Sequence, residues 1–171
     1  MRLDLSVLGW IHTVLCIIAL VLGGLNLARP KGTKSHRQIG QWYLVSLVAL
    51  SATSLGIYRL HRFFFPHWFA IAAIILACLA FAFARFRWPR QLWLHGHTSS
   101  TVLSYYVLIA GGVNEAYLRI DVLNRLAGGF PSPIIGRTHF ALMLLTVLAL
   151  IWFNMNVRRR RFPGASARSS T

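Results

Sequence analysis

Acidic residues are scarce in this chain, which has only Asp4, Glu115 and Asp121 among its 171 residues. An enzyme that uses a pair of carboxylates for acid and base catalysis would therefore have little material. Other catalytic signatures are lacking as well, because no phosphate-binding loop occurs and no nucleophile elbow surrounds Ser104. The sequence therefore argues against these enzyme classes.

Cysteine is rare too, and Cys16 and Cys78 each lie inside an apolar run without the close spacing of a metal or redox motif. We interpret both as small core residues. Hydrophobic residues make up 56% of the chain, which is more than a soluble domain usually contains. The net charge of +15 comes from basic residues in short clusters between long apolar runs. This pattern argues against a nucleic-acid-binding protein and predicts a membrane protein.

Five apolar runs are long enough, or nearly so, to cross a bilayer as helices of about 20 residues. The predicted spans are residues 7–28, 38–58, 67–85, 97–118 and 138–156. The first run lacks a small-residue cleavage site, so we expect it to remain in the membrane. Residues 120–133, IDVLNRLAGGFPSP, predict a short interfacial helix followed by a loop. The expected fold class is an all-α integral membrane protein, a bundle of five transmembrane helices.

The basic residues also predict the direction of insertion, because cytoplasmic loops carry the excess of lysine and arginine. Twelve of the 18 basic residues lie in the loops after the first and third spans and in the C-terminal segment. We therefore expect the N-terminus outside and the C-terminus in the cytoplasm, with the chain in the cell's inner (plasma) membrane. Residues 1–157 are expected to form the transmembrane domain, and residues 158–171 a basic, disordered tail that anchors the topology.

Polar residues recur at helical spacing inside the predicted spans, although polar groups in a bilayer are costly and usually face the bundle interior. The spacing of three and four residues predicts one interior face in each of three spans: residues 12, 16, 19, 23 and 26 in the first, residues 36, 40, 43, 47, 51 and 54 in the second, and residues 97, 101, 104, 108, 111 and 115 in the fourth. In the fifth span, the corresponding face is His139, Met143 and Thr146. Helix packing explains the small and hydroxyl residues on such faces, but it explains the histidines less well.

The histidines fall into two layers when depth is counted along the predicted helices. His36, His95 and His97 lie at the cytoplasmic end, and His12, His67 and His139 lie near the outer surface together with Glu115. The helix rise separates His97 from Glu115 by roughly 27 Å, so these two residues cannot share one site. We therefore expect two separate polar sites, one near each membrane surface.

Two segments carry a resemblance to a known family. They are GWIHTVLCIIALVLGGLNLARPKGTKSHRQIGQWY and LWLHGHTSSTVLSYYVLIAGGVNEAYLR. The pattern of these segments resembles the bacterial integral-membrane family domain of unknown function 2306. It consists of a histidine in the first span, HRxxGxxY at the start of the second span, and WLxxH followed by Ser-Tyr, Glu and Arg in the fourth. The resemblance covers most of residues 9–119 and implies an architecture, not a reaction. It implies these equivalent residues: His12, His36, Arg37, Gly40, Tyr43, His97, Ser104, Tyr105, Glu115 and Arg119.

Two of the functions that fit these residues involve no cofactor. The first, which the sequence favours, is an accessory or binding protein without catalytic turnover, whose partners are the lipid bilayer and a second copy or another membrane protein. Glu115 and Arg119 would then form an interfacial ion pair. The second is a transporter for a small solute, a proton or a metal ion. Its polar pathway would comprise Tyr43, Ser104, Tyr105, Glu115 and Arg119.

The third function is a b-type cytochrome that transfers electrons. Haem b in a helical bundle is held by axial histidines from facing helices. His36 with His97 would form the inner haem site, and His12 with His139 the outer one. Arg37 would meet the haem propionates.

Overall fold

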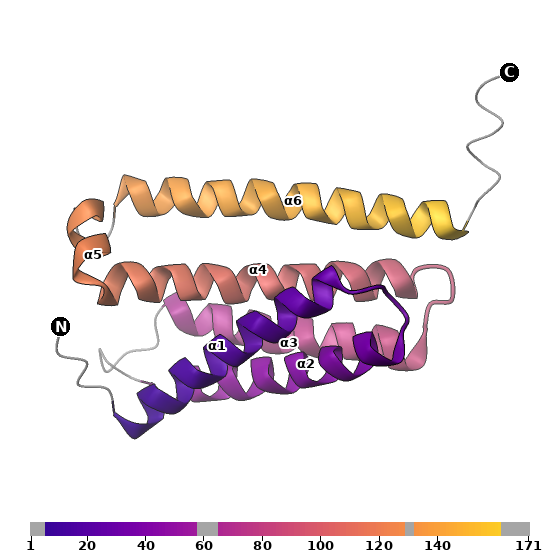
Figure 1. Cartoon of the computed structure of the whole chain (residues 1–171), viewed down its shortest axis with the longest axis horizontal. Coiled ribbons are helices and arrows are strands. Elements are labelled where there is room, and N and C mark those ends of the chain that lie inside the picture. The colour runs from indigo at the N-terminus through magenta and orange to yellow at the C-terminus, as the bar shows by residue number, and fades with distance from the viewer. Residues whose placement is uncertain (1–5, 58–64, 129–131, 162–171) are drawn as a thin grey trace, which may run out of the picture.

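The computed structural model describes residues 6–57, 65–128 and 132–161, and all regular structure in these ranges is helical. The helices are α1 (Val7–Ala28), α2 (Lys34–Leu55), α3 (Phe65–Phe86), α4 (Trp93–Arg119), α5 (Asp121–Ala127) and α6 (Pro133–Arg161). The five long helices lie roughly along one axis, and each runs opposite to the one before it (Figure 1). The prediction of an all-α chain is thus confirmed for the described residues.

Side chains in the first loop fix where α1 ends and α2 begins, because the terminal N–H and C=O groups of a helix lack partners within it. Thr33 Oγ1 accepts a hydrogen bond from His36 N at 3.1 Å at the start of α2. Lys31 Nζ donates to Asn26 O at 2.8 Å and to Leu27 O at 2.6 Å at the end of α1. The loop is therefore capped on both sides, which holds the start of α2 beside the end of α1.

Helices α1 to α4 form a bundle in which each helix packs on the next, and α4 also packs on α1. Helix α6 lies along α4, and the short α5 connects these two helices at one end (Figure 1). Because successive long helices are antiparallel, α2 and α4 run parallel and begin at the same end of the bundle. Residues early in α2 and residues early in α4 therefore lie at one level.

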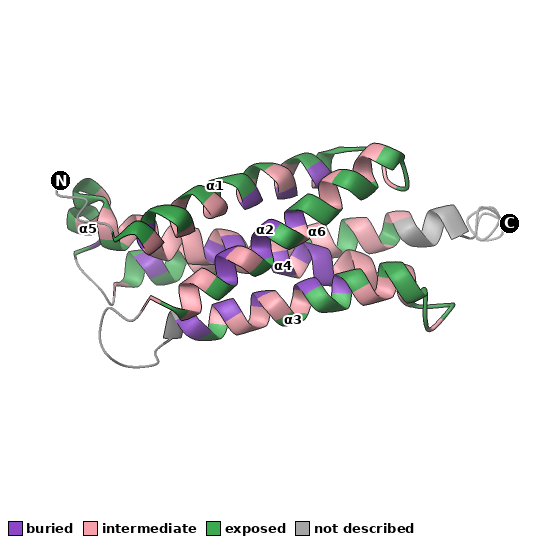
Figure 2. Cartoon of the chain, turned by 90° about the horizontal axis from the view of Figure 1, so that it is seen from below, coloured by how far each residue is buried: buried purple, intermediate pink, exposed green. Residues whose placement is uncertain are grey.

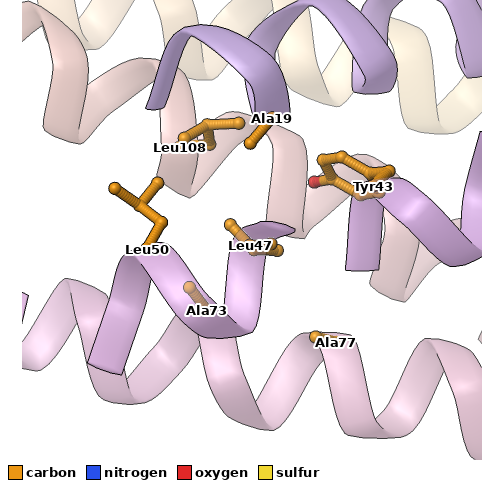
Figure 3. Packing of buried hydrophobic residues seen from close by; sticks show 7 residues of the cluster. All are labelled: Ala19, Tyr43, Leu47, Leu50, Ala73, Ala77 and Leu108. Atoms are coloured by element: carbon orange, nitrogen blue, oxygen red, sulfur yellow. The ribbon is translucent and has the colours of Figure 1, made fainter. Parts of the chain in front are cut away.

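The core lies where α1, α2, α3 and α4 meet, and it consists of small and aliphatic residues around one tyrosine (Figure 3). Its members are Ala19, Tyr43, Leu47, Leu50, Ala73, Ala77 and Leu108. The alanines of α1 and α3 let these helices approach α2 closely. Buried residues gather on the sides of the four helices that face one another, whereas α6 is mostly exposed or half-buried (Figure 2).

Three helices are long and apolar enough to cross a membrane by length and composition. They are α1, α3 from His67 onward, and α6 as far as Asn156. Large apolar side chains cover their outer surfaces, for example Ile17 on α1 and Leu145 on α6, which are 57% and 62% exposed. Soluble proteins rarely expose apolar surfaces of this extent. These helices therefore support the predicted membrane class.

The helices coincide with the predicted helical segments but differ at their ends. Helix α1 has the predicted bounds, and α5 lies within the predicted interfacial segment 120–133. Helices α2 and α4 each begin four residues before the predicted span, because a helix continues into the polar surface region whereas a span counts only residues suited to hydrocarbon. Helix α6 continues to Arg161, so residues 158–161 of the predicted disordered tail are helical. The rest of that tail, 162–171, lies outside the described residues.

Candidate functional site

His36 and His97 lie at the same end of the bundle, which we call the inner end. His36 is the third residue of α2 and His97 is the fifth residue of α4, and both helices begin there (Figure 1). Both side chains are partly buried, and they are close enough to interact electrostatically. The structure thus brings together two histidines that the sequence places on different helices.

The hydrogen bond of His97 fixes which of its ring nitrogens carries the hydrogen. His97 Nδ1 lies 2.9 Å from the backbone carbonyl oxygen of Ala80 on α3, and a carbonyl oxygen can only accept. Nδ1 is therefore the donor, and Nε2 keeps a lone pair. Ala80 is fully buried, so this bond lies in the interior of the bundle. A histidine held in this way is typical of a metal ligand, because the second nitrogen is oriented and made more basic.

Two further polar atoms at the inner end are buried and lack a hydrogen bond within the described residues. They are His36 Nδ1 and Asn26 Oδ1. Asn26 lies near the end of α1 and is only 4% exposed. Buried polar atoms without partners are rare in folded proteins, so each needs an explanation. The inner end therefore contains several atoms that could bind a ligand.

Cationic side chains lie around the inner end. Lys31 interacts electrostatically with His36, and its ammonium nitrogen lies 5.4 Å from the centre of the Phe153 ring on α6. Arg37, predicted to meet an anionic group, is exposed and directly follows His36 in α2. An anionic group bound at this end would therefore meet positive charge.

Tyr43 and Ser104 bridge α2 and α4 in the middle of the bundle. Tyr43 OH lies 2.8 Å from Ser104 Oγ, and the Ser104 hydroxyl donates to Thr101 O at 2.8 Å. Since this bond uses the only hydroxyl hydrogen of Ser104, Tyr43 is the donor to Ser104. Tyr105 OH donates to Leu20 O at 3.1 Å, and the Tyr105 ring meets the Tyr43 ring edge to face. Each of these three hydroxyls therefore has a hydrogen-bond partner, and together they form a packed polar layer.

Replacing Ser104 by alanine is expected to lower the free energy of unfolding by about 1 to 3 kcal/mol, because the Tyr43 hydroxyl would stay buried without its acceptor. Tyr43→Phe leaves the Ser104 hydroxyl with its own acceptor and should cost less, about 1 kcal/mol. The double variant should be more stable than Ser104→Ala alone. Thermal unfolding in detergent measures this order, and equal losses in the two single variants would contradict the donor assignment.

A second polar cluster lies at the opposite end, which we call the outer end. Thr53 Oγ1 donates to Leu50 O at 2.7 Å and therefore accepts from His12 Nδ1 at 3.1 Å. His12 also interacts electrostatically with Glu115 and Arg119 on α4, and these two residues form an ion pair. His12, Glu115 and Arg119 thus form a group at the outer end, separate from His36 and His97 at the inner end.

His139 and His12, the predicted outer haem ligands, have different neighbours. His139 Nδ1 donates to Ile135 O within α6 at 2.9 Å, and its Nε2 is buried without a hydrogen bond in the described ranges. Helix α6 packs on α4 and α5, whereas His12 bonds to Thr53 on α2. We therefore do not propose an outer haem site.

The predicted interior face of α6 is wrong at one position. The sequence places Met143 on the interior face, but Met143 is 45% exposed, because α6 packs only on α4 over most of its length and its interior stripe is narrow.

Asn154 lies on the interior stripe of α6 and makes a polar contact that the sequence analysis did not predict. Its Oδ1 accepts from His95 Nδ1 at 2.6 Å, and its amide nitrogen donates to Ser99 Oγ at 3.3 Å. An isolated asparagine near the end of an apolar run is the sequence signal that could have predicted this contact. His95 therefore faces α6, while His97 faces α3.

No group of three or more His, Cys, Asp or Glu side chains that could hold a metal ion occurs in the part of the chain that the structure describes. A metal-containing ligand at the inner end would therefore depend on His36 and His97 as a pair. No family model, no curated protein and no solved structure matches this chain. The resemblance to domain of unknown function 2306 stays a prediction.

Proposed function

We propose that α1, α2, α3, α4 and α6 all cross the membrane, so that the chain is a five-span membrane protein. Helices α2 and α4 have 22 and 27 residues, which exceeds the length of about 20 that a span needs. Neither contains an apolar stretch like those of α1, α3 and α6, but many of their polar residues are buried in the bundle and do not meet lipid. These buried residues are Ser46, Ser51, Ser100, Thr101 and Ser104.

The proposed orientation places the inner end in the bacterial cytoplasm. That end has the basic loops after α1 and α3, whereas the described acidic residues, Glu115 and Asp121, lie near the outer end. Reporter fusions after residues 31, 90 and 171 are expected to be active only with a cytoplasmic reporter, and a fusion after residue 128 only with a periplasmic one. The opposite pattern at all four positions would contradict the orientation, and a mixed pattern would contradict five spans.

For the inner end, we propose a b-type haem held between His36 and His97, which makes electron transfer the function that the geometry supports best. The observation that carries this proposal is the bond from His97 Nδ1 to Ala80 O, which leaves the neutral ring with a lone pair on Nε2, in a side chain that interacts electrostatically with His36. Histidines from facing helices of a bundle are the usual axial ligands of such a haem. Lys31 and Arg37 would bind its propionates. The bound haem would supply reversible one-electron transfer.

The arrangement of the two histidines favours haem over the other two functions. In an accessory protein without a ligand, two imidazoles from different helices are not expected to be held near each other, one of them with its Nδ1 bonded to a backbone carbonyl. In a transporter, the polar residues of the pathway are expected to be available to the solute. Tyr43 and Ser104 instead bond to each other in the middle of the bundle.

Titration of the purified protein in detergent with haemin tests the proposal. We expect the Soret absorbance to saturate at one haem per chain, since His36 and His97 provide one pair of ligands at the inner end. The spectrum should be that of a low-spin haem with two histidine ligands. A linear rise without saturation would mean that haemin only partitions into detergent, and it would contradict the proposal.

A further inference from the structure

Among the described residues of the inner end, Asn26 and His36 each have a buried side-chain atom without a hydrogen-bond partner. Asn26 Oδ1 is an acceptor, whereas His36 Nδ1 can carry a hydrogen and donate it. Asn26 is shielded from its surroundings, because only 4% of its surface is exposed. Asn26 Oδ1 thus lacks a hydrogen-bond donor, and His36 Nδ1 can act as that donor.

The fold holds these two residues next to each other. The His36 ring lies close enough to the backbone carbonyl of Asn26 to interact with it. The Asn26 side chain packs over Gly40, one turn after His36 in α2, where an added Cβ would lie 3.2 Å from Asn26 Nδ2. Lys31 Nζ donates to Asn26 O at 2.8 Å and so holds the end of α1 in place. Asn26 therefore lies beside His36 at the inner end.

We infer that Asn26 is the positioning residue for His36: its Oδ1 accepts a hydrogen bond from Nδ1, so that Nε2 keeps the lone pair that binds the haem iron. This inference rests on the haem binding proposed above. This hydrogen bond would satisfy both buried atoms. The arrangement repeats that of His97, whose Nδ1 donates to the Ala80 carbonyl. Such a bond fixes the ring and raises the basicity of the ligating nitrogen.

The haem affinity and the reduction potential of Asn26 variants test this role. Asn26→Leu removes the acceptor and is expected to weaken haem binding by about 10- to 100-fold. It should also raise the reduction potential, because a less basic ligand stabilises ferric iron less. Asn26→Asp keeps an acceptor and adds negative charge, so we expect it to retain haem and to lower the potential below that of the wild type.

Asn154→Leu is the matched control. It removes an amide that bonds to His95 and not to His36, so the potential should equal that of the wild type. Potentiometric titration followed by absorbance measures all four proteins. Equal potentials in the wild type and both Asn26 variants would overturn the inference while haem binding stands, and a wild type without haem would overturn the proposed function as well. If Asn26→Leu does not fold, Asn26→Asp decides: an unchanged or raised potential contradicts the inference.

Discussion

Replacing Gly23 by alanine is expected to destabilise the bundle by about 1 to 3 kcal/mol, because atoms added to a packed core force their neighbours to shift. A Cβ at Gly23 would lie 2.5 Å from Tyr105 Cδ2 and 2.9 Å from Tyr43 Cε2. Tyr105 is not free to move away, since its hydroxyl donates to Leu20 O and its ring packs against Tyr43. Helix α1 would therefore have to move away from α4. Thermal unfolding in detergent measures the loss.

Gly111→Ala is the matched control for this variant. Gly111 also lies within a helix, α4, but a Cβ there would meet no atom within 4 Å. Alanine favours the helix over glycine, so we expect a gain of up to about 1 kcal/mol. The two variants each add one methyl group and should change stability in opposite directions. Equal stability of the two would contradict the close packing of α1 on α4.

Replacing either His36 or His97 by alanine is expected to weaken haem binding by about a hundredfold or more, since even the outer partners of a metal-bound histidine contribute about 10- to 100-fold. His95→Ala is the matched control. His95 lies two residues from His97 on the same helix but bonds to Asn154 on α6. We expect this variant to bind haem with wild-type affinity. Haemin titration of each variant measures the affinities, and thermal unfolding checks that each one is folded.

The pattern across the three histidine variants separates the possible ligand sets. If His95→Ala lost affinity and His97→Ala retained it, haem would be bound between α4 and α6, and the assignment of His97 would be wrong. If His36→Ala retained full affinity, the second ligand would come from a residue other than His36. Either result would contradict the proposed pair.

The interior faces of α1, α2 and α4 could be predicted from the sequence alone. Residues three or four apart share one side of a helix, so the spacing of small and polar residues marks the side that avoids lipid. Ala19, Tyr43 and Ser104 lie on the predicted faces, and all three are buried. The parallel direction of α2 and α4 follows from counting spans, and it explains why two distant histidines share one end.

The partners of individual side chains could not be predicted in the same way. His95 and His97 are two residues apart and therefore point about 200° away from each other around the helix axis. Which neighbour each one meets depends on how α3 and α6 pack around α4. Ala80 acts through its backbone carbonyl, and no sequence pattern marks a carbonyl as an acceptor. The exposure of Met143 has a similar cause, since spacing does not show how many helices surround α6.

The absorption spectrum of the protein purified from haem-replete bacterial cells, recorded oxidised and after reduction with dithionite, tests the haem site most directly. Because His36 and His97 lie together at the inner end, we predict about one haem per chain with two histidine ligands. The Soret band should shift and sharpen on reduction. A folded but colourless protein would contradict haem binding, and the histidines would then belong to an accessory membrane protein without a cofactor.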